Sequence, residues 1–327
     1  MKTIAAAALL ASLAACATAQ EPASDPAATA AAAAPAVTER PIWANSPFGP
    51  EDRLGALNHL SPEKTAAAAQ LITTGKTYAL GMVTGPDTAA YGPRSFEVTV
   101  LQLDDGTGTP IGASRAVSND DKVSGSVGVG SQIDGLGHFG LDHMYYNGVP
   151  AADVVQPTGL TQFGTHTLPP MATRGVLLDM TRQFGNPVPD GTPFNRAEID
   201  TALEAAGLTL EPGDVVIFHT GKMAATDPTE LYQTFPGLGV EGARYLASQG
   251  VVAIGSDTWG LEVVPFEDPT RVFEVHAELL VRNGVYILEN MVTEHLAADG
   301  VTEFFFALGI PRIEGTVQAI INPVAIR

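Results

Sequence analysis

The segment from Gln132 to His138 reads Gln-Ile-Asp-Gly-Leu-Gly-His and carries the side chains with the clearest potential for chemistry. Asp134 and His138 lie four residues apart in a stretch whose glycines disfavour an amphipathic helix. Glycine also lets a backbone pass close to a small bound object. A carboxylate and an imidazole placed there could bind a divalent metal, or could serve as base and acid. The spacing is also compatible with a surface turn in which the two side chains only hydrogen-bond each other.

His276 and Glu289 are two further candidates in the second half of the chain. Leu279 and Leu280 follow His276 at helical spacing, which places it on or beside a buried helix face. Glu289 ends the apolar run 285–288, where a strand would finish. Each is compatible with an ordinary role, as a core histidine or a solvated strand end. Burying both costs several kcal/mol unless they are paired or coordinated, which favours a shared site if the fold brings them together.

Capping patterns predict the helices that surround these segments. Ser61 followed by Pro62 predicts a helix through Ile72. Asn195 and Glu198 form a capping box for a helix that ends at Gly207. Two more helices are expected, one over 240–248 and one that begins at Asp268-Pro269 and runs through Val281.

Apolar runs between the helices predict a set of strands. Residues 96–100 alternate like a half-buried strand. Buried strands are expected at 176–178, 215–218, 251–254 and 285–288, and two more at 304–306 and 317–321 close the chain. The sequence therefore predicts a mixed α+β fold, an α/β chain in one domain over 41–327 with a central β-rich core flanked by helices.

The N-terminus has the features of an exported lipoprotein. Residues 1–15 form a signal peptide with one lysine and a short apolar run, and Leu13-Ala14-Ala15-Cys16 resembles a bacterial lipobox. Cys16, the single cysteine, would be acylated, whereas an ordinary signal peptide would be cut near Ala19. Residues 16–40 are rich in alanine and proline and predict a disordered tether. We therefore expect a lipid anchor that faces the periplasm.

The charge limits the classes of partner. The formal net charge is −19, and removal of residues 1–15 would make it one unit more negative because only Lys2 is lost. Such a surface disfavours nucleic acid and anionic membranes. We expect contact with a membrane only through the anchor, and a small molecule as substrate.

Several separated motifs resemble one enzyme family. His276-x-x-Leu279-Leu280, followed by Ile287-Leu288-Glu289-Asn290, resembles the C-terminal signature of the cyclase family of metal-dependent hydrolases, which includes kynurenine formamidase, isatin hydrolase and trans-dienelactone hydrolase. The stretches 55–58, 146–149 and 255–258 are similar to other landmarks of that family. The resemblance begins near Trp43 and implies a swivelling β/β/α fold and a homodimer.

The family motif H-x-G-T-H-x-D-x-P-x-H is only partly present. Asp134 and His138 match it, whereas Gly128, Gln132 and Leu136 stand where the family has His, His and Pro. A branch with Q-x-x-x-Q-x-D-x-x-x-H is closer, although its first Gln is again Gly128 here. Gln132 offers only a neutral amide oxygen, a weaker zinc ligand than imidazole.

The resemblance assigns roles to the candidates. It implies Asp134, His276 and Glu289 as metal ligands, with Gln132 beside them, and His138 as the acid/base. Zinc is our first expectation, and manganese is the second because oxygen-rich ligands shift the preference toward the harder ion. Possible substrate contacts are Trp43, Asn58 and His219, the last at the end of a buried strand.

Two functions remain open from the sequence. The first is a hydrolase in which a metal-activated water cleaves an amide C–N bond, or an ester or lactone bond, in a small cyclic carbonyl substrate. The second is a lipid-anchored small-molecule-binding protein on a fold of this family that has lost its catalysis.

Overall fold

A mixed β-sheet forms the centre of the fold in a computed structural model that describes residues 45–101, 104–227 and 232–327. The expected signal peptide, tether, lipidation site Cys16 and substrate contact Trp43 lie outside these described residues. The sheet and the helices around it confirm the predicted mixed α+β class with a central β-rich core.

The sheet has nine strands within the described ranges. Its middle is parallel and its two margins are antiparallel. In spatial order the strands are β1 (Thr77–Ala79), β17 (Val324–Ile326), β15 (Glu303–Leu308), β9 (Met171–Asp179), β11 (Val215–His219), β13 (Ala253–Ser256), β14 (Tyr286–Glu289), β4 (Gln132–Asp134) and β16 (Gln318–Ile320). The parallel strands are apolar runs buried on both faces, as parallel sheets require.

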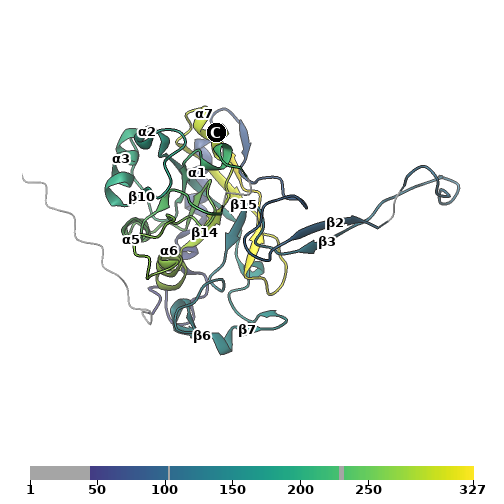
Figure 1. Cartoon of the computed structure of the whole chain (residues 1–327), viewed down its shortest axis with the longest axis horizontal. Helices are drawn as coiled ribbons and strands as arrows, with labels where there is room; N and C mark the ends of the chain where they lie inside the picture. The colour runs from purple at the N-terminus through teal and green to yellow at the C-terminus, as the bar shows by residue number, and fades with distance from the viewer. Residues whose placement is uncertain (1–44, 102–103, 228–231) are drawn as a thin grey trace, which may run out of the picture. The chain divides into compact units, whose positions relative to one another are not determined.

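Helices cover the sheet, and α2, α3, α5 and α6 gather on one side of it in Figure 1. The helices are α1 (Pro62–Ala68), α2 (Thr181–Phe184), α3 (Arg196–Ala206), α4 (Lys222–Ala225), α5 (Val240–Ser248), α6 (Glu274–His276) and α7 (Glu294–Ala298), and a π-helix over Ala277–Asn283 continues α6. The Ser61 cap of α1 and the Asn195 capping box of α3 are formed as predicted. No helix in the described part of the chain combines the length and hydropathy needed to cross a bilayer.

Short elements complete the fold. Among the described residues, four two-stranded ribbons pair β2 (Phe96–Val100) with β3 (Asp121–Gly125), β5 (Met144–Tyr145) with β6 (Val149–Pro150), β7 (Val155–Gln156) with β8 (Gly159–Leu160), and β10 (Pro193–Phe194) with β12 (Gly237–Leu238). Single 3₁₀ turns occupy Gly55–His59, Ala69–Leu71, Tyr146–Gly148, Ala151–Asp153 and Thr165–Thr167.

Two predicted elements differ from the structure. Residues 96–100 form strand β2, but the strand is not half-buried, because it pairs only with β3 in a ribbon that extends away from the sheet (Figure 1). The helix expected from Asp268 begins only at Glu274. Asp268 instead accepts hydrogen bonds from Thr270, and Phe273 adopts a left-handed conformation, so the chain turns before it becomes helical.

A glycine contact holds the N-terminal segment against the sheet near β14. The amide of Ala56 donates to the carbonyl of Gly284, and a Cβ on Gly55 would lie 2.3 Å from that oxygen. Gly284 has a positive φ of 66° and ends the π-helix just before β14. A side chain at Gly55 would therefore push this segment away from the strand that carries Glu289.

Candidate metal centre

Strand β4 places polar side chains in the middle of three antiparallel strands. Gln132 is directly opposite Glu289 of β14, and Asp134 is directly opposite Gln318 of β16. Opposite residues of an antiparallel pair share a face, and side chains two residues apart along a strand do so as well. One face of the sheet therefore presents two carboxylates and two amides side by side.

The amides of this face hold the carboxylates in place. Gln132 Nε2 donates to Glu289 Oε2 at 2.7 Å, and Gln318 Nε2 donates to Asp134 Oδ1 at 2.7 Å. Asp134 is fully buried, so the alternative of a surface Asp–His turn is wrong. A Cβ at Gly128 would meet Gln318 Oε1 at 2.5 Å, so Gln318 occupies the space beside the position where the family motif has its first histidine.

His276 approaches the carboxylates from the helical side. Its Nε2 lies 3.7 Å from Asp134 Oδ2 and 3.5 Å from Glu289 Oε1. Its Nδ1 lies 2.5 Å from the carboxylate of Glu262, which is itself buried. When Nδ1 donates its proton to Glu262, the lone pair of Nε2 points at the two carboxylates.

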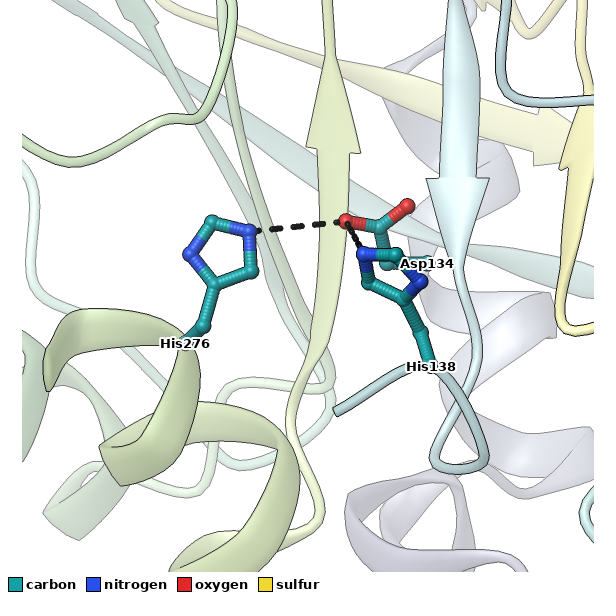
Figure 2. Close-up of side chains that lie close together, drawn as sticks. All are labelled: Asp134, His138 and His276. Atoms are coloured by element: carbon teal, nitrogen blue, oxygen red, sulfur yellow. Dashed lines mark ion pairs between the residues drawn. The ribbon is translucent and has the colours of Figure 1, made fainter. Parts of the chain in front are cut away.

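His138 lies in the turn after β4 and completes the cluster. Its Nε2 is 3.8 Å from Asp134 Oδ2, and Figure 2 shows both histidines directed at that one oxygen. The side chain of His138 is 21% exposed, whereas those of Asp134 and His276 are buried. The structure thus brings together Gln132, Asp134, His138, His276 and Glu289, although up to 157 residues separate hydrogen-bonded members.

Burial and charge shift the pKa values of these groups in opposite directions. Burial raises the pKa of Asp134, but the nearby His138 and His276 outweigh it and lower that pKa to about 2. Burial and the neighbouring Asp134 raise the pKa of Glu289 to about 7. For His276 the carboxylates of Asp134, Glu262 and Glu289 outweigh burial and raise the pKa, whereas burial lowers the pKa of His138. His138 therefore favours the neutral form.

The cluster fits a divalent ion. Asp134 Oδ2 and Gln132 Oε1 are buried atoms without a hydrogen-bond partner among the residues that the structure covers. Two ligand atoms at about 2.1 Å from one tetrahedral zinc lie about 3.4 Å apart, close to the separations of His276 Nε2 from the two carboxylates. A dication would also offset the repulsion between two buried carboxylates. Asp134, His138 and His276 are the alternative triad, with one atom of each within 4.8 Å of the others.

A cavity of about 200 Å³ opens beside the cluster. Its polar lining includes Gln132, His138, His276 and Glu289, and its remaining walls are Tyr91, Arg94, Phe139, Trp259 and Phe273. A substrate in this cavity would contact Gln132, His276 and Glu289 as well as His138.

Two sequence candidates for substrate contact do not line this cavity. Asn58 donates to Asp52 and to the carbonyl of Gly55, within the N-terminal turn. His219 lies against Thr293 at 2.7 Å and Asp257 at 3.4 Å. Both side chains hold loops in position.

Glu262, Arg94 and Gln318 were missed by the sequence analysis. Glu262 follows Gly260-Leu261 and precedes two valines, so a charged residue inside an apolar run was the available clue. Arg94 and Gln318 carry no such signal, because Arg94 reaches the site through a contact with Gly128 and Gln318 through the pairing of β16 with β4.

Glu262→Gln is expected to weaken metal binding by ~10–100-fold, because the neutral amide orients and polarises His276 less well than the carboxylate. A competitive titration against a chromophoric chelator measures this change. Glu278→Gln is the matched control, since Glu278 is equally buried and pairs with Arg244 outside the cavity. Equal metal affinity in Glu262→Gln and the wild type would contradict this role.

Comparison with known proteins identifies the family. The Cyclase family model matches residues 40–263, which include β4 and His138. The crystal structure of a novel cyclase is 30% identical, with a TM-score of 0.77, and the match covers 86% of this chain and 98% of that one. No curated protein matches the chain.

More distant structures share the fold alone. Isatin hydrolase A from Ralstonia solanacearum is 14% identical, with a TM-score of 0.62 over 82% of this chain and 98% of that one. Isatin hydrolase A from Labrenzia aggregata, bound to benzyl benzoate, is 16% identical, with a TM-score of 0.57 over 76% and 93%. With a family match over most of its length and a 30% identical structure, this chain belongs to the Cyclase family.

Proposed function

We propose that this protein is a metal-dependent hydrolase that opens or cleaves an amide, ester or lactone bond in a small cyclic carbonyl substrate. The buried cluster of Asp134, His276 and Glu289, which faces a cavity shared with His138, carries this proposal. The isatin hydrolases that share the fold support it by their names.

In this proposal the ligands bind the metal ion and His138 transfers the proton. Asp134, His276 and Glu289 would hold the ion, with the free oxygen of Gln132 beside them. A bound zinc, or manganese as second choice, supplies Lewis-acid activation of water and of the substrate carbonyl. Two carboxylates balance the charge of a dication, which favours Glu289 over the neutral His138 as the third ligand.

His138 is placed to move the proton. Its Nε2 accepts a proton from the water that attacks the carbonyl carbon, and the C–N or C–O bond then breaks. The same nitrogen returns that proton to the leaving nitrogen or oxygen. The lowered pKa of His138 suits the first step, because a neutral imidazole is required to accept the proton. Phe139 and Phe273 pack near the ring of His276 and keep bulk water from this side of the site.

Metal analysis followed by a substrate panel tests the proposal. Protein purified without chelator is expected to contain about one divalent ion per chain, and to hydrolyse at least one cyclic amide or lactone. Chelation should abolish turnover, and zinc or manganese should restore it. Metal-loaded protein that binds panel compounds without cleaving any of them would point to the binding protein instead. Anchoring at Cys16 and the homodimer remain predictions of the sequence and its resemblance.

A further inference from the structure

The walls of the cavity beside the metal centre are mostly aromatic. Trp259 stacks on Tyr91 with centroids 4.3 Å apart and ring planes at 23°, and Phe273 meets Trp259 edge-on at 6.3 Å. An engineered cavity of ~150 Å³ holds one benzene molecule. The volume of about 200 Å³ here therefore suits a single substituted ring.

Arg94 supplies a permanent positive charge to the same cavity. Its Nη1 donates to the carbonyl of Gly128 at 2.9 Å. Within the part of the chain that the structure describes, no carboxylate lies in ion-pair distance of this guanidinium. A guanidinium has five N–H donors in a planar fork, so one contact with a backbone oxygen leaves most of them for a ligand.

Arg94 lies close both to Tyr91, whose aromatic ring lines the cavity, and to His138 and Glu289 of the candidate metal centre. Its amide donates to the carbonyl of Tyr91 at 3.4 Å, so one turn carries the stacking ring and the cation. Its charge is close enough to lower the pKa of His138 and of Glu289. Once a dication balances the charges of Asp134 and Glu289, the guanidinium of Arg94 gives the cavity a net positive charge.

We propose that the substrate is a planar aromatic compound with an anionic group, which Arg94 binds while the ring lies against Tyr91 and Trp259. This inference rests on the proposed function, because it names the substrate class of the same site. A carboxylate or sulfonate accepts two parallel hydrogen bonds from the guanidinium fork, a geometry that lysine cannot reproduce. The scissile carbonyl would then lie at the other end of the ring, toward His138 and His276.

Binding of benzenesulfonate to the metal-loaded protein tests Arg94 without any turnover. A sulfonate is a poor metal ligand, so its binding reports on the guanidinium and not on the ion. The wild type should bind benzenesulfonate at least about tenfold more tightly than neutral benzenesulfonamide, as measured by titration calorimetry. Arg94→Gln should lose that preference, and Arg94→Lys should recover only part of it.

Arg182→Gln is the matched control, because it removes the same charge from an arginine that pairs with Asp179 outside the cavity. It should keep the wild-type preference. Metal content measured on every variant shows whether the site is intact. Equal affinity for the two compounds in the wild type, or an unchanged preference in Arg94→Gln with metal bound, would overturn the proposal.

A second measurement separates this inference from the proposed function. Paired aryl lactones with and without a carboxylate should differ in kcat/KM by at least about tenfold in the wild type, and much less in Arg94→Gln. If the protein hydrolyses both lactones equally well, the proposed anion site at Arg94 is refuted and the proposed hydrolase function stands. If the protein prefers the sulfonate but hydrolyses no compound, the proposed anion site stands and the proposed hydrolase function is refuted.

Discussion

His276→Ala is expected to lose the metal and the activity together. His276 Nε2 is within 3.7 Å of both carboxylate oxygens that would hold the ion, so its removal leaves two ligands of three. The change also leaves the buried Glu262 without its imidazole partner, which destabilises the fold by ~3–5 kcal/mol. Metal content, turnover and thermal unfolding of the purified variant measure the three effects.

Two companion variants make this result specific. Asp134→Asn keeps the shape of the side chain and removes its charge, so it should lose the metal with less disturbance of the fold. His219→Ala removes another buried imidazole, held by Thr293 and Asp257 outside the cavity, and should lower stability while the metal stays bound. Full metal retention in His276→Ala would refute the site.

His138→Ala should keep the metal while turnover falls by ~10²–10⁴-fold. His138 is more exposed than the three ligands, lines the cavity and carries a lowered pKa, all of which suit a proton carrier. The measurement is kcat on metal-loaded variant and wild type, with the ion quantified in the same samples.

The alternative triad gives the opposite outcome. If His138 completes a site with Asp134 and His276, its removal should strip the ion as completely as His276→Ala does. Glu289→Gln then serves as the control, because it should lose metal in the first arrangement and retain it in the second. Metal loss in His138→Ala with metal retained in Glu289→Gln would reverse the two roles.

The sequence predicted which segments carry reactive side chains better than it predicted which of those segments lie side by side in the fold. Glu289 was predicted at the end of a strand and lies at the end of β14. No strand was predicted around Gln132, where the structure has the short strand β4. The pairing of these two residues across β4 and β14 could not be predicted. The alternation of residues along a strand indicates on which face of the sheet each side chain lies, but it does not indicate which strand is the neighbour. Gln318 was missed for the same reason, since its role depends on β16 pairing with β4.

Local signals failed where tertiary contacts outweigh them. Asp268-Pro269 is a valid helix start, yet its side chain caps a turn and the helix begins six residues later at Glu274. Residues 96–100 alternate as a half-buried strand does, but Val98 and Val100 are 47% and 49% exposed, because no layer covers the β2–β3 ribbon among the described residues. Capping boxes succeeded because all of their partners lie within one turn.

The pairing of β4 also dictates when the site can form. Asp134 is held by Gln318, which follows it by 184 residues, and β4 lies between β14 and β16. Contacts of such separation form late in folding, since the closure entropy of the loop between them must be overcome first. A ribosome-bound chain that has emerged only as far as Glu289 would lack β16, the strand that pairs with β4 on the side away from β14. Asp134 therefore gains its Gln318 partner only after β16 has been made, so the complete polar face of the site forms late in folding.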